Sequence, residues 1–409
     1  VTSRIIDAAK RLQVIGRAGV GVDNVDADAA TRKGIIVMNT PLGNIESAAE
    51  HAVALLFAAA RYIPQADTSM KRGEWEKKKF TGAELAGKTL GIVGLGKVGQ
   101  IVCRVMRALD MNVLACDPFL PAAKAKDLGV TQVELDDLLA NSDFITVHTP
   151  LTDATRNLLD AAAFSKMKKT AILVNCARGG VVNEEALAAA LREKRIRMAA
   201  LDVFAKEPLP SDSPIRLLDN ALLTPHLGAS TVEAQERVAE QVAQQFADYF
   251  AYGKVRNAVN MAATLSPGME PYAAVAEIVG ELAAQVVEGA LKGVEVGIFG
   301  NIASNRQDAS IIARCVLKGV LARQSEDPVN LVNVDLIADT HGLVFNVTTS
   351  ESSRNYKNRI TVTVKSDKAA REVAGTLFED RLPRVVSIDG LPVEITPTRH
   401  ALVMFYEDR

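Results

Sequence analysis

The stretch LGIVGLGKVG, residues 90–99, is a short apolar run that leads directly into Gly94, Gly96 and Gly99. A helix-like segment follows it without a break. Glycines at this spacing allow a tight turn between a strand and a helix, and they let the backbone approach a pyrophosphate at the N-terminus of that helix. A glycine-rich turn of this kind can also be purely structural, so the pattern alone is a weak signal.

The next apolar run strengthens the signal because it ends in an acid. Asp117 lies 18 residues after Gly99, where a carboxylate can accept hydrogen bonds from the hydroxyls of an adenosine ribose. The same negative charge would repel the 2′-phosphate of NADP. The sequence therefore predicts a dinucleotide-binding site that prefers NAD.

Further apolar runs of this kind continue along the chain from residue 86 to residue 228. They alternate with helical stretches, which predicts a Rossmann-like α/β fold in which helices wrap a doubly wound parallel sheet. Each run is apolar throughout, as expected of strands that are covered on both faces. The runs are TLGIVGLG, NVLACDP, FITVHTP, TAILVNCARGG, RMAALDVF and ALLTPHLG.

Polar side chains follow the later runs where each predicted strand ends. Arg178 follows AILVN, Glu207 comes soon after MAALDVF, and His226 follows ALLTP. Ligands of open parallel sheets bind outside the carboxyl ends of the strands, so these side chains can converge although 48 residues separate the first from the last. A guanidinium can grip a substrate carboxylate, an imidazole can take a hydroxyl proton, and a carboxylate can orient that imidazole. The trio suits hydride transfer from a hydroxy acid.

Each member of the trio also has a simpler explanation. A lone histidine beside a proline is more often packed or exposed than catalytic, an arginine before two glycines can close a turn, and a glutamate before a proline can face water. Joint placement at the strand ends of a sheet that carries a dinucleotide loop favours catalysis. Of the other histidines, His148 is expected on the cofactor side. The remaining three are expected to be structural: His51, His341 and His400.

The bulk composition describes an ordinary globular protein. With 409 residues the chain is expected to form two or three domains. Its net charge of −2 lacks the basic excess of nucleic-acid-binding proteins, and no run approaches the ~18 apolar residues of a membrane span. Four cysteines stand far apart without a CxxC pair, which predicts neither a zinc site nor a disulfide framework. We expect a cytoplasmic protein with no metal, no nucleic-acid partner and no membrane attachment.

The opening residues, VTSRIIDAAK, carry no initiator methionine and resemble the middle of a helix-then-strand unit. The sequence is therefore expected to begin inside a domain. Targeting information upstream would be invisible, which leaves a plastid or another organelle open as the compartment.

The region before residue 86 contains three further predicted elements. GIIVMNT is typical of a strand, and SAAEHAVALLFAAARYIPQA is typical of one long apolar helix. The charged segment KRGEWEKKKF at 71–80 follows and is expected to be exposed around Trp75, the only tryptophan.

After residue 228 the pattern changes twice. Ser230 and Glu233 form a capping-box pattern that opens a helix, and Gly253 can end it. Beyond residue 261 come Ala/Val-rich helices and an alternating strand at 359–365, so a separate domain is expected to start there. The first helix has apolar residues at every fourth position: Val238, Val242, Phe246 and Phe250.

Five motifs together resemble the D-isomer-specific 2-hydroxyacid dehydrogenases: RAGVGVDNVD, GLGKVG, NCARGG, LDVFAKEP and TPHLGAST. The resemblance runs almost continuously from residue 1 to about residue 258. WEKKKFTGAELAGKTLGIVGLG and Cys176 in NCARGG favour the branch that acts on a phosphorylated substrate. That resemblance implies oxidation of 3-phospho-D-glycerate to 3-phosphooxypyruvate with NAD, the first committed step of phosphorylated L-serine biosynthesis.

The resemblance also implies roles for single residues. It assigns catalysis to Arg178, Glu207 and His226, and substrate binding to Arg17, Asn44, Arg178 and His226, with Arg17 as a second cation for a phosphate dianion. At Val20 only backbone groups could make a polar contact with the cofactor. The full implied set of cofactor contacts is Val20, Gly94, Gly96, Lys97, Val98, Gly99, Asp117, Thr149, Cys176, Ala177, Arg178, Asp202, His226, Leu227, Gly228 and Ala229.

The same resemblance implies a division of the chain into segments. A small flavodoxin-like substrate domain would be split by insertion of the NAD-binding domain, and an α+β intervening domain of the allosteric substrate-binding type would follow. The last residues resemble the entry strand of an ACT regulatory domain, most of which is expected beyond this sequence. The expected segments are 1–43 and 229–260 for the substrate domain, 44–228 for the NAD-binding domain, 261–392 for the intervening domain and 393–409 for the ACT domain.

Several alternatives stay open. The family pairs its nucleotide-binding domains, so a homodimer or homotetramer is expected, in which the loop around Trp75 and Lys79 either crosses to a neighbouring subunit or packs onto its own domain. A hydroxypyruvate or glyoxylate reductase is the nearest competing enzyme, and an NAD-sensing corepressor-type binding protein is the competing non-enzyme. A phosphate-binding arginine and the long C-terminal extension argue for the phosphorylated substrate.

Overall fold

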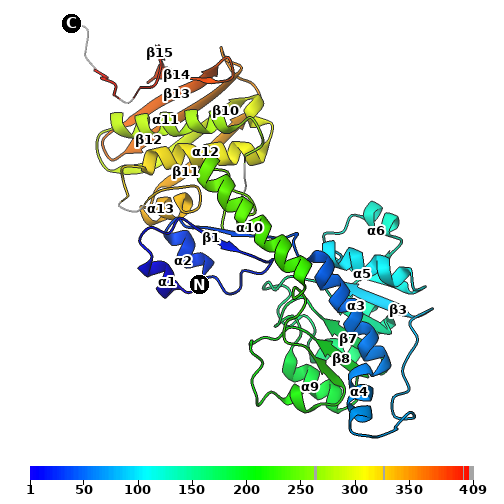
Figure 1. The fold of residues 1–409 in the computed structure, drawn as a ribbon. Helices are drawn as coiled ribbons and strands as arrows, with labels where there is room; N and C mark the ends of the chain where they lie inside the picture. The colour runs from blue at the N-terminus through cyan, green and yellow to red at the C-terminus, as the bar shows by residue number, and fades with distance from the viewer. Residues whose placement is uncertain (262–264, 326–327, 399, 405–409) are drawn as a thin grey trace. The chain divides into compact units, whose positions relative to one another are not determined.

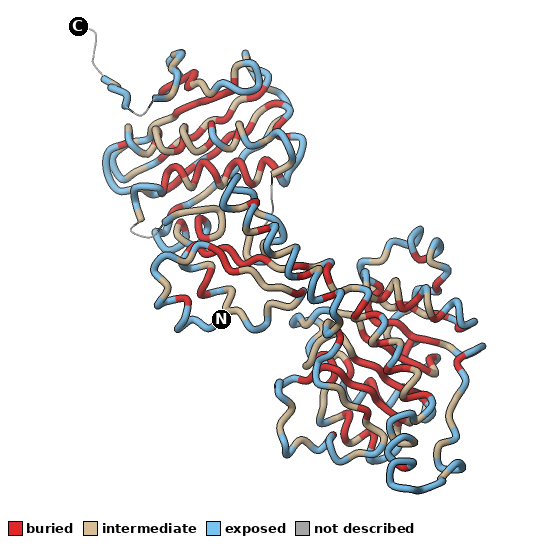
Figure 2. The backbone as a smooth tube through the Cα atoms, viewed as in Figure 1, coloured by how far each residue is buried: buried red, intermediate tan, exposed pale blue. Residues whose placement is uncertain are grey.

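The computed structural model describes residues 1–261, 265–325, 328–398 and 400–404. The chain divides into two compact units (Figure 1). We call Pro41–Glu240 the parallel-sheet unit, and Val1–Thr40 together with Gln241–Arg409 the mixed-sheet unit. Each unit has its own buried core, which lies mainly along its strands and on the helix faces that cover them (Figure 2).

Seven parallel strands form the centre of the parallel-sheet unit, in the order β5-β4-β3-β6-β7-β8-β9. Every residue of β6, β7 and β8 is buried, as expected of central strands covered on both faces. The predicted doubly wound parallel sheet is confirmed, and only the two-residue strand β5 was not predicted. The strands are β3 (Thr89–Val93), β4 (Asn112–Cys116), β5 (Thr131–Gln132), β6 (Phe144–Val147), β7 (Ile172–Asn175), β8 (Met198–Leu201) and β9 (Ala221–Leu223).

Helices cover both faces of this sheet. The core on one face includes residues of α3 and α5, and the core on the other face includes residues of α7, α8 and α9. Neighbouring residues of one strand serve opposite cores: Val174 packs in the first and Leu173 in the second. The helices are α3 (Ile45–Arg61), α4 (Ile63–Lys71), α5 (Lys97–Arg107), α6 (Ala122–Leu128), α7 (Leu135–Asn141), α8 (Ala161–Lys166), α9 (Glu184–Arg192) and the short 3-10 helix η1 (Pro214–Leu217).

The single long helix predicted over residues 47–66 is wrong. Helix α3 ends at Arg61, Tyr62 adopts a left-handed conformation with φ of 53°, and α4 begins at Ile63. Pro64 explains the break, because proline has no N–H to donate and its ring clashes with the preceding turn of a continuing helix. The charged segment after α4 is exposed as predicted, with Trp75 at 80% exposure.

The mixed-sheet unit carries a six-stranded sheet in the order β11-β10-β12-β13-β14-β15. Only β10 and β11 pair in parallel, and the other neighbours are antiparallel. The predicted strand at 359–365 is confirmed as β12, in which buried and less buried residues alternate. The elements are α11 (Glu270–Val286), β10 (Leu291–Gly300), η2 (Asn301–Ala303), α12 (Arg306–Leu321), α13 (Val334–Thr340), β11 (Val344–Ser350), β12 (Asn358–Ser366), β13 (Ala370–Phe378), β14 (Leu382–Ile388) and β15 (Leu391–Ile395).

Strand β15 runs across the expected boundary between residues 392 and 393. It pairs with β14 at the edge of this sheet, so the first residues of the expected ACT segment belong to the same sheet as the intervening segment. Residues 399 and 405–409 of the expected ACT segment lie outside the described residues. The division of the chain into five segments stays a prediction.

The N-terminal residues form a small parallel pair of strands, β1 and β2. Residues near position 260 add hydrogen bonds to β2. Val37 in β2 donates to Asn260 Oδ1 at 2.9 Å, and Val259 donates to the Val37 carbonyl at 2.8 Å. A Cβ at Gly16 in β1 would lie 2.5 Å from side-chain atoms of Phe246, so glycine is required for this close packing. The elements are α1 (Ser3–Ala8), β1 (Val14–Arg17), α2 (Ala27–Arg32) and β2 (Ile36–Asn39).

Helix α10 (Val232–Tyr252) differs from its prediction at its start and along its apolar stripe. Thr231 Oγ1 accepts a hydrogen bond from the Ala234 N–H at 3.2 Å, so the cap lies one residue after the predicted Ser230. Gly253, with φ of 66°, follows the last residue as predicted. Phe250, the last member of the stripe, is 67% exposed. Among the helices that the structure describes, none combines the length and apolar character needed to cross a membrane.

Candidate active site

The glycine loop between β3 and α5 requires glycine for two different reasons. Gly94 has φ of 90°, and a Cβ there would lie 2.8 Å from the His148 carbonyl oxygen. A Cβ at Gly99 would lie 2.4 Å from the carbonyl oxygen of Gly94. Gly96 has no atom within 4 Å of the place of its missing Cβ. Gly94 and Gly99 therefore permit the tight turn, whereas Gly96 leaves open space beside the N-terminus of α5.

The residues around this loop fit a dinucleotide. Gly96 has no side chain that could cap α5, so the first N–H groups of the helix can serve an anion. Thr149 Oγ1 is buried and has no hydrogen-bond partner among the described residues, so a ligand could supply one. Asp117 accepts from the N–H of Leu95 at 2.8 Å and of Phe119 at 2.9 Å, and so holds the loop in shape. A bound NAD would be held by residues 94–98 with Asp117 and Thr149.

His226 and Glu207 form a hydrogen-bonded pair next to the end of β9. His226 Nδ1 lies 2.7 Å from Glu207 Oε2, and the two side chains are 47% and 37% exposed. The other carboxylate oxygen, Oε1, accepts from the Phe204 N–H at 3.0 Å. Glu207 is thus anchored at one oxygen and orients the imidazole with the other. The pairing leaves Nε2 as the ring nitrogen that can exchange a proton with a substrate.

The backbone of His226 adopts an unusual conformation. Its φ is 58°, in the left-handed region that side-chain-bearing residues rarely occupy, at a cost on the order of 1 kcal/mol. Its N–H donates to the carbonyls of Asp202 at 2.9 Å and Thr224 at 3.0 Å. Such a conformation persists only where the surroundings hold it, so the contacts of this loop bear directly on the place of the imidazole.

Arg178 follows β7, the strand that neighbours β8. The Asn175 side-chain amide donates to its carbonyl at 3.1 Å, and its own guanidinium donates to the Ala177 carbonyl at 2.7 Å. The three residues predicted for catalysis thus follow three adjacent strands, β7, β8 and β9, at the same edge of the sheet.

Asp202 occupies the centre of this region and is completely buried. Oδ1 lies 3.1 Å from His51 Nε2, 2.6 Å from Thr224 Oγ1 and 2.7 Å from the Leu227 nitrogen. Oδ2 accepts from the Gly228 N–H at 2.8 Å. Burial alone would raise the pKa of this carboxyl, but the four donors outweigh burial and lower the pKa. Asp202 therefore carries a negative charge inside the protein.

Two further groups near the strand ends remain neutral. Burial, with a smaller contribution from the Asp202 charge, raises the pKa of the Cys176 thiol far above its usual range, so this thiol is no nucleophile. Burial lowers the pKa of His148 to about 4. Its Nε2 lies 3.0 Å from Thr146 Oγ1. His148 is therefore uncharged at neutral pH.

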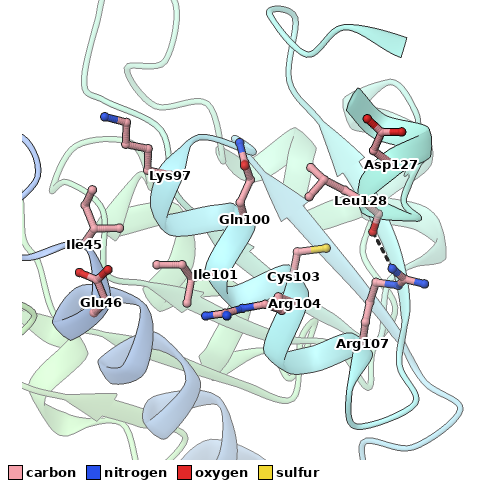
Figure 3. A pocket seen from close by; sticks show the side chains of 10 residues that line it. All are labelled: Ile45, Glu46, Lys97, Gln100, Ile101, Cys103, Arg104, Arg107, Asp127 and Leu128. Carbon is pink, nitrogen blue, oxygen red and sulfur yellow. Dashed lines mark hydrogen bonds between the residues drawn. The ribbon is translucent and has the colours of Figure 1, made fainter. Parts of the chain in front are cut away.

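The cavities of the parallel-sheet unit differ in whether the His226–Glu207 pair lines them. One, of about 550 Å³, lies along α5 between Lys97 and Arg107 and is also lined by residues of α3 and α6; Arg107 donates to the Leu128 carbonyl there at 2.7 Å (Figure 3). Neither His226 nor Glu207 lines it. The second, of about 540 Å³, contains both members of the pair. Its apolar wall consists of Phe204, Pro208, Leu209, Leu223 and Pro225.

The other residues predicted at the substrate are distributed over both units. Asn44 directly precedes α3 in the parallel-sheet unit. Arg17 ends β1 in the mixed-sheet unit, and in the same unit the Asn39 side-chain amide donates to the Val20 carbonyl at 2.7 Å. Their contacts with substrate or cofactor stay predictions. No group of three or more His, Cys, Asp or Glu side chains is placed to hold a metal ion in the part of the chain that the structure describes.

Sequence reasoning missed the neighbours of Asp202. The sequence predicts a structural role for His51 and indicates no role for Ser47 or Thr224. Ser47 Oγ donates to the Gly228 carbonyl at 2.8 Å. The four-residue spacing of Ser47 and His51 places them on one face of α3. That spacing could have linked these two residues, but the sequence contains no signal that α3 meets the loop of His226.

Comparison with known proteins defines first a class and then a branch within it. Residues 53–228 match the sequence profile of the NAD-binding domain of D-isomer specific 2-hydroxyacid dehydrogenases. Residues 268–389 match that of the D-3-phosphoglycerate dehydrogenase intervening domain. The D-3-phosphoglycerate dehydrogenase of Archaeoglobus fulgidus is 43% identical over 412 aligned residues, which cover 100% of this chain and 78% of the relative. The chain belongs to the D-3-phosphoglycerate dehydrogenase branch of the D-isomer specific 2-hydroxyacid dehydrogenase family.

Solved structures show the same fold over part of the chain. An NAD-dependent formate dehydrogenase from Staphylococcus aureus in complex with NAD has a TM-score of 0.59 and 34% identity, over 63% of this chain and 77% of that one. A glyoxylate reductase from Paecilomyes thermophila has a TM-score of 0.58 and 33% identity, over 63% and 78%. The predicted Rossmann-like fold and the predicted NAD cofactor are confirmed.

Proposed function

We propose that the chain oxidises 3-phospho-D-glycerate to 3-phosphooxypyruvate with NAD, the first step of phosphorylated L-serine biosynthesis. The hydrogen-bonded pair of His226 and Glu207 carries the proposal, because it supplies a proton acceptor at the carboxyl edge of an NAD-binding sheet. The relatives named D-3-phosphoglycerate dehydrogenase, which align with the whole chain, support the choice of substrate.

The reaction requires the substrate to lose a hydride from carbon and a proton from its hydroxyl. NAD, when bound, accepts the hydride. In this proposal His226 takes the hydroxyl proton on Nε2, because Nδ1 is engaged with Glu207. In the reverse direction the same nitrogen returns the proton to the carbonyl oxygen.

Glu207 orients His226 and stabilises the positive charge that the ring gains. Its carboxylate accepts from Nδ1 and therefore favours the tautomer with a free Nε2 lone pair. The bond from the Phe204 N–H keeps the carboxylate in place during proton transfer.

Arg178 would hold the substrate carboxylate in this proposal. Its planar guanidinium can form two parallel hydrogen bonds with a carboxylate and can polarise the neighbouring oxygen. Its position after β7 places it at the same edge of the sheet as His226. Arg17 would supply the second cation, for the phosphate.

Steady-state turnover tests the proposal against its alternatives. We expect 3-phosphoglycerate with NAD to give the highest kcat/KM among 3-phosphoglycerate, hydroxypyruvate and glyoxylate, each with the matching form of NAD or NADP. Faster turnover of glyoxylate or hydroxypyruvate would favour a reductase, the alternative supported by the similar glyoxylate reductase fold. Absence of turnover with retained NAD binding would favour an NAD-sensing binding protein.

We further propose that two parallel-sheet units pair through the loop around Trp75, giving a homodimer or a homotetramer. Trp75 is 80% exposed, which favours contact with a neighbouring subunit over packing onto its own unit. Trp75→Ala should raise the dimer dissociation constant about tenfold or more in analytical ultracentrifugation. Phe119→Ala, at a site 90% exposed, is the matched control. An unchanged dimer dissociation constant for Trp75→Ala would show that the units do not pair through this loop.

The cytoplasm is the compartment that we propose. All four cysteines are free thiols, which suits a reducing environment. Fractionation of cells that produce the protein, followed by detection with an antibody, would test this assignment.

A further inference from the structure

We propose that His51 is a positioning residue for proton transfer: acting through Asp202, and together with Ser47, it fixes the loop 226–228 that carries His226. This inference rests on the proposed function of His226. It concerns a part of α3 to which neither the sequence nor the family resemblance assigns a role.

Asp202 links His51 to the loop. Its carboxylate accepts the N–H groups of Leu227 and Gly228, and its own carbonyl accepts that of His226 at 2.9 Å. Three successive loop residues are thus held by one residue at the end of β8. Because Asp202 is buried and charged, any displacement of its carboxylate moves the acceptors on which the loop depends.

His51 is the donor that reaches this carboxylate from α3. Nε2 lies 3.1 Å from Asp202 Oδ1 and 3.2 Å from Thr224 Oγ1. The Thr224 hydroxyl also donates to Oδ1 at 2.6 Å. The imidazole and the hydroxyl therefore brace one oxygen of the carboxylate from two elements, α3 and the residue that follows β9.

Ser47 holds the same loop one helical turn earlier. Its hydroxyl donates to the Gly228 carbonyl at 2.8 Å and is buried. A Cβ at Gly228 would lie 3.3 Å from Asp202 Oδ2 and 3.9 Å from Ala48 Cα. The loop is thus packed closely between α3 and Asp202, with hydrogen bonds on both sides.

The left-handed backbone of His226 makes these contacts important for the reaction. A residue with φ of 58° relaxes when its supports are removed. Relaxation would move the imidazole from Glu207, and small displacements of a proton-transfer group cost large factors in rate. The contacts of His51 and Ser47 should therefore affect the chemical step more than the binding of 3-phosphoglycerate, whose charged groups would be held by Arg17 and Arg178. The resemblance also places Asp202 and residues 227–229 at the cofactor, so NAD binding should weaken as well.

Kinetics of three variants of the full chain test this proposal. His51→Phe keeps a ring but removes the donor, and it should lower kcat about tenfold per NAD-binding site while the KM for 3-phosphoglycerate changes less than about twofold. His51→Gln should restore most of kcat, because its amide nitrogen can take the place of Nε2. His341→Phe makes the same change at an exposed position of the mixed-sheet unit and should leave kcat unchanged.

Hydrogen exchange supplies a readout that does not need turnover. The amides of Leu227 and Gly228 should exchange faster in His51→Phe than in the wild type, and at near wild-type rates in His51→Gln. Ser47→Ala, a smaller change, should also speed exchange in this loop and lower kcat about threefold. This variant keeps the test usable where His51→Phe folds poorly.

The outcomes separate the two proposals. If the wild type fails to oxidise 3-phosphoglycerate or His226→Ala retains the rate, the proposed function is wrong. The role of His51 in fixing the loop is then tested by hydrogen exchange of the Leu227 and Gly228 amides alone. If oxidation depends on His226 but His51→Phe leaves both kcat per site and exchange unchanged, the positioning role is wrong. A loss of thermal stability in His51→Phe with an unchanged rate per site would also overturn it, since a purely structural role predicts that result.

Discussion

Two strands of the parallel sheet, β6 and β9, are each followed closely by a histidine, and the two histidines are chemically opposed. His148 directly follows Val147, has the Thr146 hydroxyl at 3.0 Å, and has a pKa lowered to about 4 by burial. His226 follows β9, is half exposed and lies 2.7 Å from the Glu207 carboxylate. Residue type and place on the sheet are nearly the same at the two strand ends.

The difference shows which features make a strand end reactive. In the proposed reaction, exposure would allow substrate to reach His226, and the Glu207 carboxylate would stabilise the charge that the ring gains on taking a proton. His148 is less exposed, and burial is the only influence on its pKa, so a proton on its ring would be largely desolvated without a counter-charge. The loop after β6 thus contributes its backbone to the turn at Gly94, whereas the loop after β9 carries the side chain that we propose for proton transfer.

The largest expected effect separates the two histidines directly. His226→Ala should lower kcat for 3-phosphoglycerate oxidation by ~100-fold or more, as removal of a general base typically does. NAD affinity, measured by fluorescence titration, should change little because the glycine loop and Asp117 are intact. His148→Gln should lose far less activity. Equal losses in the two variants would contradict the distinction between the two strand ends.

A smaller effect is expected when the partner of His226 loses its charge. Glu207→Gln keeps an oxygen that can accept from Nδ1 but removes the charge that stabilises the protonated ring, so kcat should fall about ten- to hundredfold. Glu184→Gln serves as a control, because the Glu184 carboxylate accepts from the Ala205 N–H in the same region and makes no contact with His226 among the described residues. A Glu207→Gln enzyme with the wild-type rate would show that orientation alone suffices.

A third effect concerns stability and leaves the rate at neutral pH unchanged. Unfolded histidine binds a proton near pH 6.5, whereas folded His148 binds one only near pH 4. The unfolded state therefore gains more protons as pH falls through this window, and the folded state loses stability, by up to about 3 kcal/mol from this group.

Urea unfolding at pH 7, 5.5 and 4.5 measures this loss. The free energy of unfolding should fall more steeply with acidity in the wild type than in His148→Gln, which lacks the titrating ring. Comparing the two slopes separates His148 from other acid-sensitive groups, such as the buried carboxylate of Asp202. Parallel slopes would show that His148 is protonated in the folded state as easily as in water.

The same comparison explains what the sequence could predict. The parallel sheet, the glycine loop and the edge that carries Arg178, Glu207 and His226 follow from local patterns: apolar runs, glycine spacing and polar residues at strand ends. These features depend on residues near one another in the chain. The break at Tyr62 could also have been predicted from Pro64, two residues later. The apolar pattern that continues across it favours one long helix instead.

Other features depend on contacts that no local pattern contains. His51 and Asp202 are separated by 151 positions, and Ser47 and Gly228 by 181. Their pairing follows from how α3 packs on the sheet. The different surroundings of His148 and His226 likewise follow from burial and from a neighbouring carboxylate. For such reasons the supports of the proposed catalytic histidine were visible only in three dimensions.

Strand β2 forms hydrogen bonds with Val259 and Asn260, which lie more than 200 residues later in the chain. This separation has a consequence for synthesis on the ribosome. The Val37 N–H can bond to Asn260 only after the ribosome has added 223 further residues. At roughly 5–20 residues per second, that interval lasts about 10–45 s. During this time the β1–β2 pair is an unfinished fragment with an unpaired edge, while the whole parallel-sheet unit emerges and can fold. A nascent chain halted before residue 241 should therefore show a protease-sensitive N-terminal segment ahead of a protected nucleotide-binding unit.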